Sequence, residues 1–313
     1  MLYRSTRNKL DAFTAYRALR LNNDSNSGII LPMRVPVIDD NAIEKMKSKD
    51  FLQNVADVLN LFFGTEFTAW DMESTIGKTP VQLVECGQKV MLAQIWKNPA
   101  SQFEYYQKSL FALLCPEYSA KPASWARVAI RIALIAASVL SLAEKESDVA
   151  VNCGDFEQVL AVYYCRKMGV PIRKILIACN ENSNIWDFVY RGTIHSNASL
   201  QNTAYPALDK VIPDLFEAYL FLSYGQEETQ RFLNAVADKQ DYQLTEQMAL
   251  PANDDLFVSV VGQERIPAVI NSFRTNNGLF INPYTAFSLG VLQDYRAKAG
   301  ESCLTLIFEE AAP

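Results

Sequence analysis

Histidine is nearly absent from this chain of 313 residues, and His195 is its only example. That count excludes a histidine-rich metal site, and a serine–histidine–aspartate triad would have to use His195. The surrounding stretch RGTIHSNAS is polar, which predicts an exposed loop or helix cap. We expect no bound metal ion.

Long apolar runs and an excess of positive charge are also lacking. The longest apolar stretch, Ile132–Leu140, is shorter than a membrane span and predicts a buried helix. The net charge of −6 offers no electrostatic surface for a nucleic-acid backbone. The opening MLYRSTRNKLDAF has no apolar signal-peptide core, so we expect a cytoplasmic protein that binds neither membranes nor nucleic acids.

The chain has six cysteines but no CxxC pair. They stand singly in apolar runs such as LFALLC and ILIAC, which is typical of buried thiols in a reducing compartment. Cys153 precedes a predicted helix and could be a nucleophile with His195 as its base. We interpret it instead as a buried core thiol.

The apolar pattern changes along the chain and predicts two domains. The breakers in GKTP (77–80) separate a mixed N-terminal domain, residues 1–77, from a second domain, residues 78–313. Further predicted elements are helices over 10–20, 51–63 and 101–114, a helix over 124–143 with Ser124 as its N-cap, two strands meeting at 86–87, and a strand over 305–308.

The clearest unit in the sequence is a strand over 148–153, a helix over 156–168 and a strand over 174–179. A glycine, Gly169, follows the helix. This order predicts a right-handed βαβ crossover. Both strands are apolar, which predicts a parallel sheet covered on each side. The fold class is therefore α/β, with an open, mostly parallel sheet and helices on both faces.

Several segments carry motifs in one consistent order: YRSTR (3–7), SGIILP (27–32), TPVQLVECGQKV (79–90), SWAR (124–127), the block 153–182 and NPYTAFSLGVLQDY (282–295). Together they resemble the threonine synthase family, pyridoxal-phosphate (PLP) enzymes of the tryptophan synthase β-like group, fold type II. The block 153–182 is the most specific, because it is similar to the family's S-G-N-F-G-D…N-E-N segment throughout. The resemblance implies the large domain of such an enzyme.

The cofactor lysine of the family is missing here. It lies in a G-P-T-x-A-F-K-D motif, which resembles NPASQFEY (98–105), and Glu104 stands at the lysine position. A carboxylate cannot form an imine, so the resemblance implies that covalent catalysis by this route is lost. Lys97 and Lys108 are nearby, but either would need a rebuilt pocket.

The phosphate-binding loop of the family resembles Gly154, Asp155, Phe156 and Glu157. Asp155 replaces the family's asparagine, and Glu157 replaces its second glycine. Two carboxylates beside a phosphate dianion oppose its binding, and the lost glycine restricts close backbone approach. The resemblance therefore implies a degenerate cofactor site.

Two more departures concern the walls of the family's cleft. The family inserts a smaller lobe before its N-W-A-R helix, whereas only residues 115–123 separate the two helices here. The segment EEAAP (309–313) resembles the family's G-T-A-H-P, with Glu310 in place of the hydroxyl that faces the pyridine nitrogen. Without a closing lobe, water is not excluded from a reactive intermediate.

These departures favour a threonine synthase-like protein that has lost PLP binding and catalysis, with no cofactor and no catalytic residue. A binding, regulatory or partner-interaction role would remain, with a protein partner or a second copy of the chain.

Three alternatives stay open. New chemistry could use the carboxylates of Glu104, Asp155 and Glu157, as acid and base or around a metal, although solvated surface charges are the favoured interpretation. A sensor of an amino acid or phospho-amino acid could use Arg7, Asn180 and Asn182. Residual PLP-dependent threonine synthase or lyase activity is the third.

Overall fold

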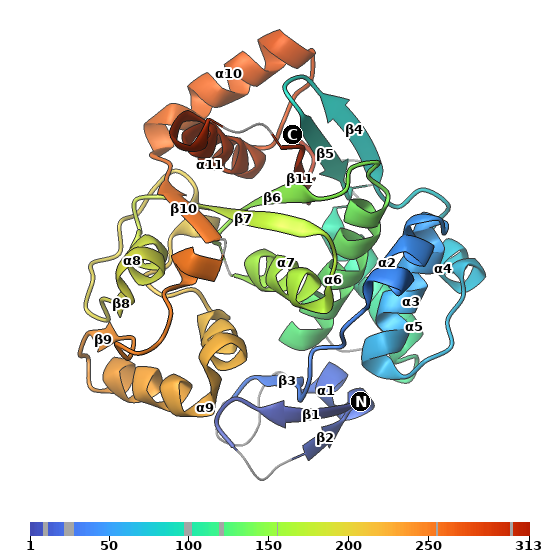
Figure 1. Cartoon of the computed structure of the whole chain (residues 1–313), viewed down its shortest axis with the longest axis horizontal. Coiled ribbons are helices and arrows are strands. Elements are labelled where there is room, and N and C mark those ends of the chain that lie inside the picture. Colours follow the sequence, from blue (N-terminus) through green and yellow to red (C-terminus); the bar gives the residue numbers. More distant parts are fainter. Residues whose placement is uncertain are drawn as a thin grey trace.

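The computed structural model of the chain describes residues 1–8, 12–21, 28–96, 102–118, 122–154, 156–254, 256–300 and 303–313, with only the backbone described at 253–254. Asp155, Lys97 and the whole NPAS segment (98–101) therefore lie outside the described residues. Figure 1 shows a central sheet with helices above and below it.

Six strands form the central sheet in the order β10-β7-β6-β11-β5-β4. All neighbouring pairs are parallel except β4 and β5, which form a hairpin. The strands are β4 (Gln82–Cys86), β5 (Val90–Gln94), β6 (Ser147–Asn152), β7 (Ile172–Cys179), β10 (Leu256–Val260) and β11 (Thr305–Glu309). The predicted βαβ unit, the two strands that meet at 86–87 and the mostly parallel sheet are confirmed.

Alternate residues of the central strands enter different hydrophobic clusters, because successive side chains of a strand point to opposite faces. Val149 and Val151 of β6 join one cluster, whereas Ala150 between them joins the other. Leu306 and Ile307 of β11 divide in the same way. An apolar residue at every position is what a sheet covered on both sides requires.

Helices cover the two faces of the sheet (Figure 1). One face carries α11 (Pro283–Ala299), with α10 (Ile266–Asn277) packed against it. The other face carries α7 (Glu157–Met168) and α8 (Asn184–Arg191), and α6 (Ser124–Leu140) lies behind α7. Helices therefore cover both faces of the sheet, as predicted.

Helix α6 is mostly apolar and is buried throughout 132–140, as predicted. Ser124 is its first residue rather than its N-cap, which is Ala123, and the helix ends at Leu140 instead of 143. Arg131 is a charged residue within this buried helix.

Helix α7 ends at Gly169, whose φ of 98° lies in the left-handed region. A Cβ atom at this position would meet the Ile38 carbonyl oxygen at 2.6 Å. The Ile38 amide in turn donates a 2.8 Å hydrogen bond to the Met168 carbonyl. Glycine thus permits both the helix end and the close passage of the N-terminal segment.

The N-terminal region has a three-stranded sheet and four helices (Figure 1). The elements are β1 (Leu2–Ser5), β2 (Ala12–Thr14), α1 (Ala15–Arg20), β3 (Ile30–Pro32), α2 (Asp40–Lys47), α3 (Phe51–Phe63) and α4 (Ala69–Ile76). The helix predicted over 51–63 is confirmed. The one predicted over 10–20 is wrong at 12–14, because these residues pair with β1 and the helix begins at Ala15.

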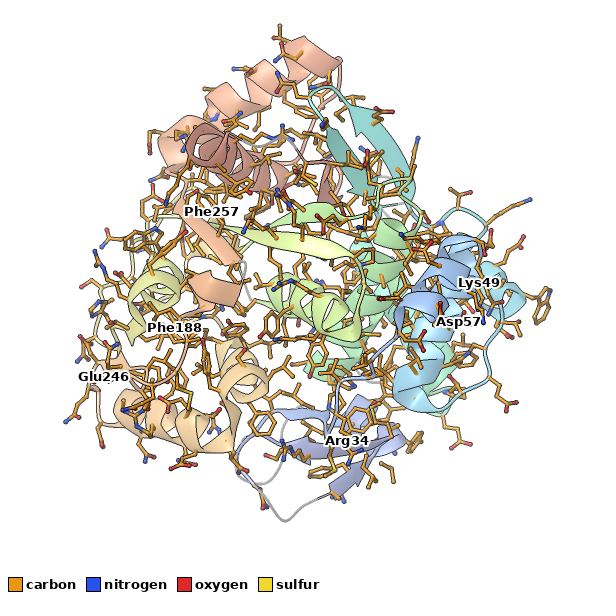
Figure 2. All side chains as sticks on the ribbon, in the orientation of Figure 1. Arg34, Lys49, Asp57, Phe188, Glu246 and Phe257 are labelled. Atoms are coloured by element: carbon orange, nitrogen blue, oxygen red, sulfur yellow. The ribbon has the colours of Figure 1, made fainter. Side chains whose placement is uncertain are left out.

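Contacts between α3 and its surroundings hold this region together. Lys49 and Asp57, labelled in Figure 2, form a 2.6 Å ion pair at the start of α3. Helix α3 also packs against α6. The Tyr3 hydroxyl donates a 2.7 Å hydrogen bond to the Phe62 carbonyl, and burial raises its pKa.

The remaining helices are α5 (Phe103–Leu114) and α9 (Phe216–Ala237), and the remaining strands, β8 (Thr193–Ile194) and β9 (Tyr242–Gln243), pair with each other. Three short 3-10 turns lie at Pro206–Leu208, Pro251–Asp254 and Gln263–Arg265. Helix α9 is interrupted at Gly225, which adopts a φ of 83°. Phe188 (Figure 2) packs edge-on against Phe216 of α9 at 4.9 Å between ring centroids.

The described residues between α5 and α6, 115–118 and 122–123, contain no helix or strand. Nor does any helix in the described parts of the chain have the length and apolarity needed to cross a membrane.

Candidate functional site

A cleft of about 760 Å³ lies at the carboxyl-terminal edge of the central sheet. Asn152 ends β6, Gly154 follows it, and Glu310 follows β11, so parallel strands bring these residues to one edge. This edge is where open α/β sheets bind ligands. Most of the remaining lining residues come from the start of α5, the first turns of α6 and α7, the segment 207–214 and the start of α11.

Four cationic side chains line the cleft: Lys108, Arg127, Arg131 and Lys210. Each has a carboxylate partner. Lys108 pairs with Glu104 at 3.0 Å, and Lys210 pairs with Asp214 at 3.1 Å. Arg127 pairs with Glu157, and Arg131 pairs with both Glu157 and Glu310. Every cationic side chain in the described lining of the cleft is therefore paired with a carboxylate of the chain.

Glu157 is the first residue of α7, and its side chain is only 2% exposed. Arg127 Nε donates a 2.6 Å hydrogen bond to Oε1 of Glu157, and Arg131 Nη1 donates to Oε2. A carboxylate at a helix N-terminus is also favoured by the helix dipole. Two guanidinium groups and the helix end thus compensate this buried charge.

Glu310 connects the C-terminal segment to the same network. Its two carboxylate oxygens accept hydrogen bonds from Nε and Nη2 of Arg131, at 2.7 and 2.9 Å. Its carbonyl accepts a 3.0 Å hydrogen bond from the Phe103 amide. The Arg131 guanidinium lies over the Phe103 ring, 4.2 Å from its centroid. One arginine therefore joins α5, α6, α7 and the segment after β11.

Glu104, Asp155 and Glu157 are predicted to be solvated surface charges. The two that the structure describes, Glu104 and Glu157, differ in how far their carboxylates are buried. Glu104 on α5 is 67% exposed and pairs only across one helical turn with Lys108, as that interpretation predicted. For Glu157 the interpretation is wrong, because two arginines hold its carboxylate in the interior. Asp155 lies outside the described residues.

Gly154 and Phe156 shape the loop before α7. A Cβ atom at Gly154 would lie 3.3 Å from the Ala207 carbonyl oxygen, so a glycine allows the segment 207–214 to pass close by. Phe156 has a φ of 69°, a strained value for an aromatic residue. Its buried ring packs edge-on against Phe216 and Tyr219 of α9, which holds this conformation.

Asn180 and Asn182, predicted as ligand contacts, are outside the cleft lining. Asn180 Nδ2 donates a 2.6 Å hydrogen bond to Asp209, and Asn182 exchanges hydrogen bonds with the backbone of Gln201. Asp209 also accepts from the amide and hydroxyl of Thr203. These side chains fasten the segment 201–209 to the sheet.

Arg7, the third predicted ligand contact, also lies elsewhere. Its guanidinium pairs with the buried Glu217 of α9 at 2.6 Å, and Thr6 donates a hydrogen bond to the same carboxylate. The YRSTR motif thus anchors the N-terminal region to α9.

A smaller pocket of about 480 Å³ adjoins Asn182 and contains His195. His195 Nδ1 lies 2.7 Å from Asp241, and both side chains are exposed, as predicted for a polar loop. Cys153 is not among the residues lining this pocket and is buried, as predicted. Its thiol lies beside Cys179, whose pKa is raised by a hydrogen bond with Cys153 and by burial.

Sequence reasoning missed Arg131, Lys210 and Asp214. The signal for Arg131 is its position within an otherwise apolar helix, since a buried arginine needs a carboxylate partner. Lys210 and Asp214 are four residues apart, a spacing that favours an ion pair within a turn.

Among the described residues, no group of three or more histidine, cysteine, aspartate or glutamate side chains could hold a metal ion. The carboxylates of the cleft are instead distributed among its cations.

Comparison with known proteins gives agreeing results. The sequence profile "Threonine synthase N terminus" matches residues 2–79. "Threonine synthase-like 1" of Pongo abelii is 26% identical over 204 residues, which are 62% of this chain and 27% of that protein. The PLP-bound threonine synthase of Brucella melitensis superposes with a TM-score of 0.85 at 17% identity, over 100% of this chain and 89% of that one. The chain is therefore threonine synthase-like: residues 2–79 match the N-terminal region of that family, and the fold is that of threonine synthase.

This threonine synthase-like chain matches only part of the length of its curated relatives. Threonine synthase of Pseudomonas aeruginosa is 24% identical over 187 residues, 58% of this chain and 40% of that protein. The chain therefore spans less than half the length of either curated relative named here. The superposition on the Brucella enzyme identifies the fold as that of the fold type II large domain.

Proposed function

We propose that this threonine synthase-like chain is a non-catalytic binding protein that does not use PLP. The observation that carries the proposal is the pairing of every described cation in the cleft with a carboxylate of the chain itself. Such a cleft has no surplus positive charge for a phosphate dianion.

The residues present do not fit the cofactor of the family. At the start of α7, where helix amides favour an anion, the Glu157 carboxylate is already buried between two arginines. At the position assigned to the cofactor lysine, Glu104 is exposed and paired with Lys108. We therefore derive no step through PLP.

The space of the cleft supports a binding role. Its volume of about 760 Å³ is within the range of small-molecule sites. Besides the cations and carboxylates of the five ion pairs, the lining presents neutral polar side chains such as Gln107, Gln158 and Thr285. A small, polar ligand without net charge, such as a zwitterionic amino acid, matches this lining best.

Exposure of the purified full chain to PLP tests the loss of cofactor chemistry. After gel filtration, we expect no visible absorbance from lysine-bound PLP. After borohydride reduction, mass spectrometry should find no single lysine modified in a stoichiometric amount. The cleft lysines Lys108 and Lys210 are the ones to examine, because they line the cleft.

The matched variants Lys108→Arg and Lys210→Arg keep the positive charge and remove the reactive amine. Stoichiometric labelling of the wild-type chain that disappears in one of these variants would overturn the proposal. Low, unselective labelling that persists in both variants supports it. For the binding role, we expect calorimetry with neutral amino acids to give saturable binding, and none with any of them would contradict that role.

A further inference from the structure

Glu157 occupies a position that elementary electrostatics assigns to an anion. It opens α7, and its carboxylate is 2% exposed. Arg127 and Arg131 reach it from α6. Removing a carboxylate from water is costly unless charged donors replace the lost hydration. Here two guanidinium groups and the end of a helix replace it.

Carboxylate and phosphate oxygens are recognised by the same chemistry. Arginine forks donate paired hydrogen bonds to either group, and helix N-termini attract either charge. The donors around Glu157 would therefore suit an external phosphate equally well if the Glu157 side chain were absent.

Glu157 also determines the charge balance of the cleft. Arg131 is shared between Glu157 and Glu310, whereas Arg127 has Glu157 as its carboxylate partner. Without Glu157, the arginines would carry about one positive charge more than the remaining carboxylate compensates. With Glu157 present, a phosphate dianion would have to enter beside a buried negative charge.

We propose that Glu157 is a specificity-determining residue whose carboxylate fills an anion-binding position and excludes phosphate-bearing ligands from the cleft. The inference rests on the proposed function and sharpens it, because it names the class of small molecule that the cleft rejects. Removal of the carboxylate should uncover a site for inorganic phosphate or a phosphomonoester.

The test measures thermal unfolding of the full chain in increasing inorganic phosphate, with chloride at matched ionic strength as reference. The proteins are the wild type, Glu157→Gly and Glu157→Gln. We expect phosphate to raise the melting temperature of at least one variant above its value in chloride, with affinity at least about tenfold tighter than in the wild type, or about 1.4 kcal/mol. A variant that folds only in phosphate also counts as a gain.

Two controls assign the effect to the site. Glu104→Gln removes an exposed carboxylate from the same cleft and should gain no phosphate binding. Adding Arg127→Ala to Glu157→Gly should remove the gain, since Arg127 would be a ligand of the phosphate. Equal phosphate response of the wild type and both Glu157 variants would overturn the inference, and so would an equal gain in Glu104→Gln.

This outcome is separable from that of the proposed function. If the wild type forms no lysine adduct with PLP and the Glu157 variants gain no phosphate binding, only the role of Glu157 fails. If the wild type forms a stoichiometric adduct, the proposed function fails whatever the variants do.

Discussion

The two walls of the cleft carry their charges in opposite ways. On α5, Glu104 and Lys108 form an ion pair in which both side chains are about two-thirds exposed. On the other wall, Arg131 lines the cleft and pairs with Glu157 behind it, both side chains are almost fully buried, and Glu310 joins them from the segment after β11. The first wall leaves its charges in water, whereas the second removes them from it.

This difference shows that residue type alone does not decide what a carboxylate does in this fold. A pair in water gains little, because solvent screens it and both side chains lose freedom. A buried pair contributes little net stability as a whole, but the loss of one partner is expensive because the other stays charged and buried. The buried wall should therefore respond far more strongly to mutation.

The largest effect is expected for Glu157→Ala. The substitution leaves Arg127 and Arg131 without their shared carboxylate, which should lower the free energy of unfolding by about 3–5 kcal/mol in chloride. Denaturant unfolding measures this loss. Combining Glu157→Ala with Arg127→Met should recover part of it, because the cation that lost its carboxylate partner is then gone. A loss below about 1 kcal/mol would contradict the buried character of this wall.

Asp209→Ala should have the next largest effect. Asp209 accepts hydrogen bonds from Asn180 and Thr203 and holds the segment that faces the cleft. Unpartnered donors should cost about 1–3 kcal/mol in unfolding free energy. Asp209→Asn keeps one acceptor oxygen and should cost less. The assignment fails if both variants unfold like the wild type.

Glu228 is a buried carboxylate outside the cleft, and it extends the comparison to pH. Burial opposes its ionisation, but hydrogen bonds from Tyr242 and Thr245 and the nearby Arg231 lower its pKa below the usual range. Its charged form therefore stabilises the fold above the ordinary carboxyl pKa, and this contribution is lost as the pH falls through the lowered value.

This predicted pH dependence is tested by measuring the unfolding free energy of Glu228→Gln and of the wild type between neutral and acidic pH. The stability difference from the wild type should shrink as the pH falls, because the wild type loses its charged carboxylate. A constant difference across the range would show that Glu228 does not titrate in this way.

The smallest effect is expected for Glu104→Gln on the exposed wall. Its pair with Lys108 spans one helical turn, and such pairs contribute about 0.3–0.5 kcal/mol. Chemical unfolding at low salt should show a loss no larger than this, and added salt should remove it. A loss of about 2 kcal/mol or more would remove the contrast between the walls.

Local patterns in the sequence were sufficient for the elements that build the sheet. The βαβ unit, the hairpin at 86–87 and α3 follow from apolar periodicity and glycine positions. Local patterns were not sufficient for the region before α1, because pairing with β1 takes residues 12–14 out of the predicted helix. Tertiary pairing overrides local propensity there.

The charge network of the cleft could not be derived in the same way. Arg131 meets Glu157 across 26 residues of sequence and Glu310 across 179. Motif resemblance identified Glu157 and Glu310 as departures, but only the fold shows that one buried arginine joins them. Asn180 and Asn182 show a second limit of motif reading: they are predicted as ligand contacts, and only the fold shows that their side chains fasten a neighbouring segment.

The most direct test of the central claim is the amount of PLP retained by the purified full chain after exchange into cofactor-free buffer, measured per mole of protein. The claim that internal ion pairs have replaced cofactor binding predicts far less than one mole per mole, with no dependence on Lys108 or Lys210. One mole per mole, lost on mutation of one cleft lysine to arginine, would contradict it.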